Sequence, residues 1–304
     1  MTTLPSISIV LPTRNNENDL IDCIDSIVNL DFPLKNIEII IWDNNSDKRS
    51  KRKTKDFLAQ IEESKLVEIE FVENSTNYGV YTSRDKLFKR ISESIQFVLS
   101  IDDDVILPAN ILRVLIPLFD KDSRIGIIGP RTVYDDGDLE TAHGAGFINW
   151  WLGRYSDFDA REKLECDYVI GCCMLIKRSV IDEIEGFDPD YYTSHGEVDF
   201  CIKAKQEGYK TMYCPEVIVR HRVERGGTQT LERKYYVFRN KLFVIKKNAP
   251  LPQKWIALSL YFLFWPFKAI FDSLRRNRRI NLQEIKIILK AITDAWLKKS
   301  GKKI

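Results

Sequence analysis

The sequence lacks the glycine-rich phosphate motifs of the common nucleotide-binding folds. Its 304 residues include only 14 Gly and 11 Pro, which excludes a collagen-like or low-complexity chain. Neither GxGxxG nor GxxxxGK[ST] occurs, and this disfavours a dinucleotide dehydrogenase and a P-loop phosphotransferase. The formal net charge is only +2, which argues against nucleic acid as a partner.

Two further absences concern cysteine pairing and membrane insertion. The six cysteines form no CxxC pair and show no zinc-ligand spacing, so we expect reduced, buried thiols in a cytoplasmic chain. The sequence passes directly from Met1 into the apolar run 7–11, and we expect no signal peptide. The uncharged aromatic run 255–267 has 13 residues, fewer than the ~20 that span a bilayer.

Apolar runs alternate with helical patterns over the first hundred residues. The runs expected to be strands are 7–11, 37–42, 67–72 and 95–101, and the expected helices are 19–30, 51–64 and 81–94. This alternation predicts an α/β fold with a mostly parallel sheet covered by helices on both faces. Ligands of such sheets bind at the carboxyl ends of the strands. Polar groups follow three of the predicted strands, at 13–15, at Asp43 and at 102–104, so we expect a nucleotide site there.

Three consecutive aspartates, Asp102, Asp103 and Asp104, follow the fourth predicted strand. Adjacent carboxylates repel one another unless a cation is close. A divalent cation that bridges carboxylate and diphosphate oxygens removes this repulsion. The triplet therefore predicts a site for Mn²⁺ or Mg²⁺, and a solvated acidic turn is the alternative.

Several motifs in order along residues 5–245 resemble those of glycosyltransferase family 2, which has the GT-A fold. The motifs are 10–15, 42–46, 77–79 with Arg84, 102–104, 171–176, 186–188, 196–200, 208–209, Pro215 and His221. The later segment 235–240, followed by an apolar stretch, resembles the rhamnosyltransferase-like branch of that family. The resemblance implies a GT-A fold and an enzyme that uses a nucleotide-diphospho-sugar donor.

The resemblance also assigns roles on the donor side. Asp104 and His221 are expected to bind the metal, Asp102 to face the ribose, and Asp43 to accept a hydrogen bond from a uracil or thymine N–H. The full set of expected donor-binding residues is Pro12, Thr13, Arg14, Asn15, Asp43, Arg84, Asp102 and Asp103. Alternatives are a helix cap or Asx turn for Asp43, an exposed helix residue for Arg84, and a core or surface histidine for His221.

The general base is expected near residue 197. The family usually has two acidic residues, a variable residue and Asp, whereas this chain has Gly196-Glu197-Val198-Asp199. Alignment on Asp199 places Glu197 at the position of the base. Asp199 is expected to lie in the following helix and to orient neighbouring groups, and it is the alternative base. A third interpretation is that Glu197 only caps that helix. One base on the acceptor side implies inversion at the anomeric carbon.

Positive charge is concentrated at the C-terminus. Residues 272–304 carry a net charge of +7 and residues 1–271 a net charge of −5. The aromatic stretch 255–271 precedes Arg275, Arg276, Arg278 and Arg279, a pattern typical of a helix that lies in a membrane interface. Residues 281–297 also present one apolar helical face. Packing of these helices on the catalytic domain, or on a second subunit of a homo-oligomer, is the alternative.

The sequence therefore predicts a GT-A domain at 1–248, with a nucleotide half at 1–105 and an acceptor half at 106–248, and a membrane-associating helical tail at 249–304. The expected function is inverting, metal-dependent transfer from a UDP- or dTDP-sugar, with dTDP-rhamnose as one candidate. The expected acceptor is a hydroxyl of a glycan or lipid-linked saccharide in surface-glycan synthesis. The expected location is cytoplasmic, peripheral on the inner face of the cell membrane. A polyprenyl-phosphate sugar transferase and a non-catalytic nucleotide-sugar-binding or scaffold subunit are the alternatives.

Overall fold

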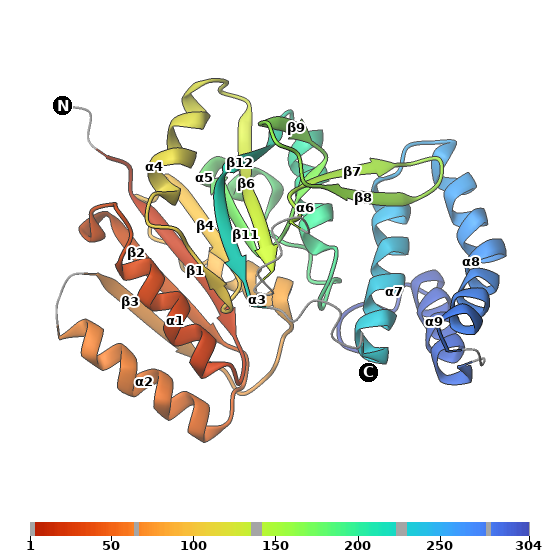
Figure 1. Cartoon of the computed structure of the whole chain (residues 1–304), viewed down its shortest axis with the longest axis horizontal. Coiled ribbons are helices and arrows are strands. Elements are labelled where there is room, and N and C mark those ends of the chain that lie inside the picture. The colour runs from red at the N-terminus through yellow and green to blue at the C-terminus, as the bar shows by residue number, and fades with distance from the viewer. Residues whose placement is uncertain (1–3, 64–66, 135–141, 223–229, 278–280, 304) are drawn as a thin grey trace.

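The computed structural model describes residues 4–63, 67–134, 142–222, 230–277 and 281–303. A large sheet with helices on both faces occupies one end of the molecule (Figure 1). The other end contains α7 (Leu231–Asn248), α8 (Gln253–Asn277) and α9 (Leu282–Trp296). A hairpin of β7 (Ala145–Asn149) and β8 (Arg154–Phe158) extends from the sheet towards these helices. At the hairpin turn, the Tyr261 hydroxyl of α8 donates a hydrogen bond of 3.1 Å to the Gly153 carbonyl.

Strands and helices alternate along the first hundred residues, as the apolar pattern predicts. The strands are β1 (Ile7–Thr13), β2 (Ile37–Asp43), β3 (Glu68–Glu73) and β4 (Phe97–Ile101). Between them lie α1 (Glu17–Val28), the 3-10 helix η1 (Leu34–Asn36), α2 (Lys48–Glu62) and α3 (Val80–Phe88). These strands pair in parallel in the order β3-β2-β1-β4, which confirms the predicted parallel arrangement for this half of the sheet.

The second half of the sheet is mixed. Its strands are β5 (Val105–Ile106), β6 (Ile125–Tyr134), β9 (Leu164–Cys166), β11 (Cys173–Lys177) and β12 (Lys210–His221). The order continues from β4 as β11-β6-β12-β5, and β9 pairs with β12. Strand β11 runs antiparallel to β4 and β6, so it begins where β4 ends. The Asp102 N–H accordingly donates to the Cys172 carbonyl at 2.9 Å, and the start of β11 lies beside the predicted nucleotide site.

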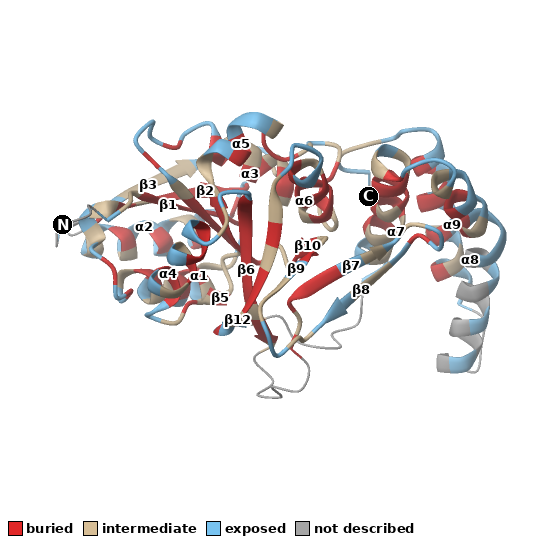
Figure 2. Ribbon diagram, turned by 90° about the horizontal axis from the view of Figure 1, so that it is seen from above, coloured by how far each residue is buried: buried red, intermediate tan, exposed pale blue. Residues whose placement is uncertain are grey.

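The strands are apolar on both faces because helices cover both faces. Side chains alternate across a strand, so Ile9 and Leu11 of β1 enter one hydrophobic cluster and Val10 enters the other. Figure 2 shows the buried strands between the two helical layers. The remaining elements are α4 (Ile111–Leu115), η2 (Ile116–Asp120), β10 (Tyr168–Val169), which pairs with β7, α5 (Arg178–Ile184) and α6 (Gly196–Gln206).

Helix α9 confirms the helix predicted at 281–297, and its apolar face packs on the rest of the chain. Ile288 and Ile292 are buried in the same hydrophobic cluster as Leu242 of α7. At this interface the Tyr235 hydroxyl donates to Asp294 Oδ2 at 2.8 Å. Helix α9 therefore packs on the catalytic domain, which was the alternative to membrane binding, because α7 covers the apolar face of α9.

Helix α8 differs, because it leaves large apolar side chains exposed. Phe267 is 71% exposed and Phe271 is 64% exposed, and much of the outer surface of α8 is exposed (Figure 2). Among the described residues, no helix combines the length and the apolar character that a bilayer crossing requires. Arg275 of the predicted arginine cluster is exposed, whereas Arg278 and Arg279 lie outside the described residues.

Candidate active site

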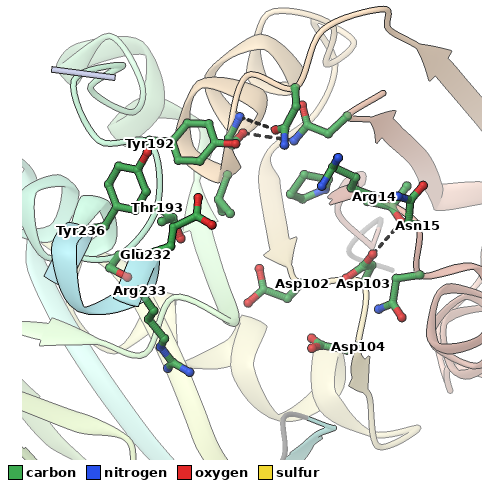
Figure 3. A pocket seen from close by; sticks show the side chains of 18 of the residues that line it. Arg14, Asn15, Asp102, Asp103, Asp104, Tyr192, Thr193, Glu232, Arg233 and Tyr236 are labelled. Carbon is green, nitrogen blue, oxygen red and sulfur yellow. Dashed lines mark hydrogen bonds between the residues drawn. The ribbon is translucent and has the colours of Figure 1, made fainter. Parts of the chain in front are cut away.

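The carboxyl ends of β1 and β4 border a cleft of about 680 Å³, a size typical of ligand sites. In Figure 3, Arg14 and Asn15 lie on one side, residues of α7 lie on the other, and the three aspartates lie between them. The predicted residues that line the cleft are Pro12, Thr13, Arg14, Asn15, Asp102, Asp103, Asp104 and His221.

Strand pairing brings Asp102, Asp104 and His221 together. His221 ends β12 and pairs with Val105 of β5, the residue that follows Asp104. His221 Nε2 lies 3.0 Å from Asp104 Oδ1 and 3.9 Å from Asp102 Oδ2. One candidate ligand atom from each of the three residues lies within 4.8 Å of the other two. Two carboxylates and an imidazole in this arrangement can bind one divalent cation.

The surroundings of the cluster favour a positive charge. Asp104 Oδ1 is buried and accepts no hydrogen bond of good geometry within the described residues. Burial alone lowers the pKa of His221, but the adjacent Cys172 and Asp104 outweigh burial and raise that pKa to about 12. Burial raises the pKa of Asp102, and the guanidinium of Arg84 opposes this increase. The residues present therefore fit Mn²⁺ or Mg²⁺, whose charge would compensate the clustered carboxylates.

Two aspartates are held by neighbouring side chains. Arg84 of α3 is 1% exposed, and its Nη2 lies 2.7 Å from Asp102 Oδ1. Arg84 is absent from the cleft wall and therefore orients Asp102 from the buried side. The Thr13 hydroxyl donates to Asp103 Oδ2 at 2.6 Å. Burial raises the pKa of Asp103 to about 7, against the effect of this hydrogen bond.

Glu197 lies in the first turn of α6, where the Tyr81 hydroxyl donates a hydrogen bond to Glu197 Oε2. A Cβ at Gly196 would lie only 2.4 Å from the Tyr81 ring. Glycine at the position where the family usually has an acid therefore makes room for that ring. Burial raises the pKa of Glu197, opposed by the Tyr81 hydrogen bond and by Arg84. Because Tyr81 and Arg84 are neighbours on α3, one helical turn contacts both Glu197 and Asp102.

Asp199 does not reach the cleft. Its side chain is 1% exposed, and Lys203 Nζ lies 3.0 Å from Oδ2. Asn248 Nδ2 donates to Asp199 Oδ1 at 2.7 Å. Two positions along a helix correspond to a rotation of about 200°, so Glu197 and Asp199 face opposite ways. Glu197 is also absent from the residues that line the cleft, but it contacts Tyr81, which lies on the same turn of α3 as Arg84. Asp199 instead has a place in the packing of α6 against α7.

Asp43 is also absent from the cleft wall. Its carboxylate is 1% exposed and lies 3.3 Å from Lys51 Nζ. Both carboxylate oxygens accept from the Ser46 N–H at 3.2 Å. The Asp43 side chain folds back onto its own loop, so its contacts are those of the turn that the sequence left open as an alternative. The neighbouring Asn44 lines the cleft instead.

Helix α7 forms a wall of the cleft that the donor motifs did not predict. Its contribution begins at the N-cap Thr230 and includes Glu232, Arg233 and Tyr236. The Tyr236 ring lies 5.1 Å from that of Tyr192, centroid to centroid. The Lys303 N–H donates to the Tyr236 hydroxyl at 3.0 Å. The C-terminal segment thus supports the cleft through α7.

The motif at 235–240 explains how α7 holds the loop before Glu197. The fully buried Asn240 donates to the carbonyls of Thr193 and Ser194 at 2.5 and 2.8 Å. Arg239, also fully buried, donates to the carbonyls of Asp190 and Gly301 at 3.2 and 2.6 Å. This motif was the sequence signal for the α7 wall, but only the fold shows which loop it binds.

The mixed sheet and the Asp–Asp–His cluster at its strand ends define the GT-A class of fold. Solved structures that share this fold include two that match most of this chain. The mannosyltransferase PcManGT from Pyrobaculum calidifontis, in complex with GDP-Man and Mn²⁺, has a TM-score of 0.66 and 15% identity, and the match covers 98% of this chain and 89% of that chain. TarS 1–349 of S. aureus, in complex with UDP, has a TM-score of 0.63 and 17% identity, with coverage of 97% and 81%.

The chain belongs to glycosyl transferase family 2. The family model of that description matches residues 8–185, and a model described as Glycosyl transferase family group 2 matches residues 97–275. The chain is 26% identical over 259 residues to the uncharacterized protein y4gI of Sinorhizobium fredii, spanning 80% of this chain and 27% of that protein. It is 20% identical over 263 residues to an N-acetylglucosaminyltransferase of Rhizobium leguminosarum bv. phaseoli, spanning 82% of this chain and 57% of that protein.

Proposed function

We propose that this chain is an inverting, metal-dependent glycosyltransferase that moves a sugar from a UDP- or dTDP-sugar to a hydroxyl of a glycan or lipid-linked saccharide. The observation that carries the proposal is the Asp102–Asp104–His221 cluster in the cleft, linked through Arg84 and Tyr81 of α3 to Glu197. One turn of α3 thus contacts both the proposed leaving-group site and the proposed base.

Each residue has a chemical task in this proposal. Asp104 and His221 would hold the cation, which would supply charge neutralisation for the diphosphate leaving group. Arg84 fixes the orientation of Asp102 towards the donor. Glu197 accepts the proton of the acceptor hydroxyl, and the Tyr81 hydrogen bond holds its carboxylate in place. A single displacement assisted by one base inverts the anomeric centre.

The pyrimidine nucleotide is the finer part of the proposal. The structural neighbours described above include one complex with GDP-Man and one with UDP, so the fold is compatible with both kinds of base. Thr13 pairs with Asp43 in the sheet register, which puts Asp43 next to a cleft residue. To accept from a uracil or thymine N–H, Asp43 must exchange its contact with Ser46. The resemblance of 235–240 to the rhamnosyltransferase-like branch supports dTDP-rhamnose as a candidate donor.

Donor binding and turnover test this function together. We expect UDP or dTDP with Mn²⁺ to raise the melting temperature of the full-length chain more than GDP with Mn²⁺ does. We also expect hydrolysis of the matching nucleotide-sugar without acceptor. Hydrolysis with no transfer to any hydroxyl acceptor, but with transfer to a polyprenyl phosphate, would favour the polyprenyl-phosphate alternative. Binding without hydrolysis or transfer would favour the non-catalytic alternative.

We further propose that the catalytic unit at 1–248 acts at the cytoplasmic membrane surface, to which the tail at 249–304 attaches it. The supporting feature is the α8 stripe, which we define as Leu263, Phe267 and Phe271, spaced four residues apart and 62%, 71% and 64% exposed. Such spacing puts the three side chains on one helical face. The exposed Arg275 follows it, as an interface-lying helix requires.

Full-length protein is expected to sediment with anionic vesicles at low salt and to be partly released at high salt, because salt screens the lysines and arginines. The double substitution Phe267→Asp with Phe271→Asp is expected to weaken sedimentation at least ~100-fold, since each buried phenylalanine contributes about 1.5–3 kcal/mol. Leu4→Asp, which changes another exposed apolar residue, is the control.

The oligomer alternative predicts a different result. Wild-type protein would then ignore vesicles, and the double substitution would convert a multimer into a monomer in light scattering. The full chain is the appropriate material, because removal of residues beyond 248 would uncover the apolar face of α7 that α9 buries.

A further inference from the structure

Three polar side chains near Glu197 lack the partners that their burial requires. The Tyr155 hydroxyl of β8 and His195 Nδ1, directly before α6, are buried and form no hydrogen bond within the described residues. Their rings meet edge to face, with centroids 5.4 Å apart. Lys241 of α7 is half-buried, and its Nζ lies 5.3 Å from the centre of the Tyr155 ring. Among the described residues, Asp157 is the carboxylate that attracts Lys241, without a close ion pair between them.

This arrangement opposes folding unless a ligand completes it. A buried polar atom left unsatisfied costs about 1–3 kcal/mol, and within the described part of the chain the charge of the partly buried Lys241 is compensated only by the Tyr155 ring and by the attraction of Asp157. Burial lowers the pKa of Lys241, against the attraction of the exposed Asp157. Burial, together with the charge of Lys241, lowers the pKa of His195 to about 3, so the imidazole is neutral at pH 7.

The chemistry of the three groups is complementary to an oxygen-rich anion. A lysine ammonium has three donors, a tyrosine hydroxyl has one, and a neutral imidazole can donate one N–H. Hydrogen bonds from an ammonium to phosphate or carboxylate oxygens are among the strong ones. An uncharged sugar hydroxyl could satisfy Tyr155 and His195 but would add no negative charge next to Lys241.

The position of the three groups points to the acceptor rather than the donor. None of them lines the cleft that contains the metal-fitting cluster. His195 lies two residues before Glu197, and the Glu197 charge contributes to the raised pKa of Tyr155, after burial and two other neighbouring groups. They come from three separate elements, the β7–β8 hairpin, the start of α6 and α7, which converge beside the base.

We propose that Lys241, His195 and Tyr155 form a subsite for an anionic group of the acceptor, a phosphate or a carboxylate, which holds a neighbouring hydroxyl against Glu197. This subsite rests on the proposed function, since it assigns the acceptor class of the same enzyme. It makes charged acceptors better substrates than neutral ones.

Binding of inorganic phosphate tests the subsite without turnover. Full-length protein is first saturated with UDP and Mg²⁺, so that the donor cleft is filled, and phosphate is then titrated by calorimetry. Lys241→Met keeps most of the aliphatic stem and removes the charge, and it is expected to weaken phosphate binding about tenfold or more. Lys177→Met is the matched control, because Lys177 Nζ also lies over an aromatic ring, 5.4 Å from the centre of Phe119, and Lys177 belongs to β11, which contributes no residue to this cluster.

Tyr155→Phe supplies a second variant whose effects on stability and binding differ in sign. Removal of a buried hydroxyl without a partner is expected to leave the melting temperature unchanged or higher, while phosphate binding weakens. Unchanged phosphate affinity in both Lys241→Met and Tyr155→Phe would overturn the subsite. A large loss of stability in Tyr155→Phe would also count against it, since the hydroxyl would then have a structural partner.

Transfer assays separate the sources of the anion. Saccharide acceptors that carry a phosphate, a carboxylate or neither are compared in wild type and Lys241→Met. The KM for the charged class is expected to rise about tenfold in the variant, with kcat little changed. Equal use of charged and neutral acceptors by wild type would refute the proposal. Absence of all transfer with intact, Lys241-dependent phosphate binding would instead refute the proposed function.

Discussion

Asp104→Ala is expected to abolish sugar transfer and metal-dependent nucleotide binding together. Asp104 Oδ1 is buried, lies 3.0 Å from His221 Nε2 and accepts no well-formed hydrogen bond within the described residues. A cation held there contributes several kcal/mol to stabilising the leaving group, and loss of that stabilisation corresponds to about a thousandfold in rate. Turnover and the affinity for UDP with and without Mn²⁺ are the measurements.

The matched control is Asp120→Ala, which removes an exposed carboxylate outside the cleft. This variant should transfer sugar at the wild-type rate, and its nucleotide binding should depend on metal as in the wild type. EDTA in excess should inhibit the wild type, and added Mn²⁺ should restore it. Full turnover in excess EDTA, or an Asp104→Ala enzyme that keeps its metal response, would contradict the assignment.

Glu197→Gln is expected to reduce turnover about 100-fold or more, the usual contribution of a general base. The amide keeps the shape of the side chain, so UDP affinity and melting temperature should change little. The rate of the wild type should rise with pH as Glu197 loses its proton. Because burial raises the pKa of Glu197, the acid limb of the pH–rate profile should lie above the ordinary range of a glutamate.

Asp199→Asn is the comparison for Glu197→Gln. It removes the charge that faces Lys203 and alters the contact with Asn248, so we expect a loss of stability of about 1–3 kcal/mol and a smaller loss of turnover. A wild-type rate in Glu197→Gln, together with an inactive but normally stable Asp199→Asn, would transfer the role of base to Asp199.

The sequence predicted the nucleotide half of the fold because its signals are local. Strands covered on both faces read as continuous apolar runs, and the polar groups at 13–15 and 102–104 follow those runs directly. The predicted helix 81–94 was too long, since α3 ends at Phe88. Antiparallel β11 was not predicted, because an apolar run carries no information about strand direction.

Roles that depend on side-chain direction could be predicted only in part. The resemblance to glycosyltransferase family 2 assigned Asp43 to the uracil or thymine ring of the donor. It left Glu197 and Asp199 as competing candidates for the general base. In the fold, Asp43 turns back to Ser46, and Asp199 faces Lys203 and Asn248. A motif specifies which residue types occur, whereas the helix rotation and the turn geometry decide which neighbours each of them contacts.

Sequence alone determined the class of this protein: an α/β nucleotide-binding chain of glycosyltransferase family 2 with an acidic metal-fitting triplet and an apolar, basic C-terminal segment. Tertiary structure decided which groups act together. The pairing of β12 with β5 brings His221 to Asp104, α7 completes the cleft, and Lys241, His195 and Tyr155 gather beside Glu197. It also separated the two tail helices, since α9 packs on α7 while α8 keeps an exposed apolar stripe. An amphipathic pattern predicts that a helix has an apolar face, but the partner of that face depends on contacts between residues far apart in the chain.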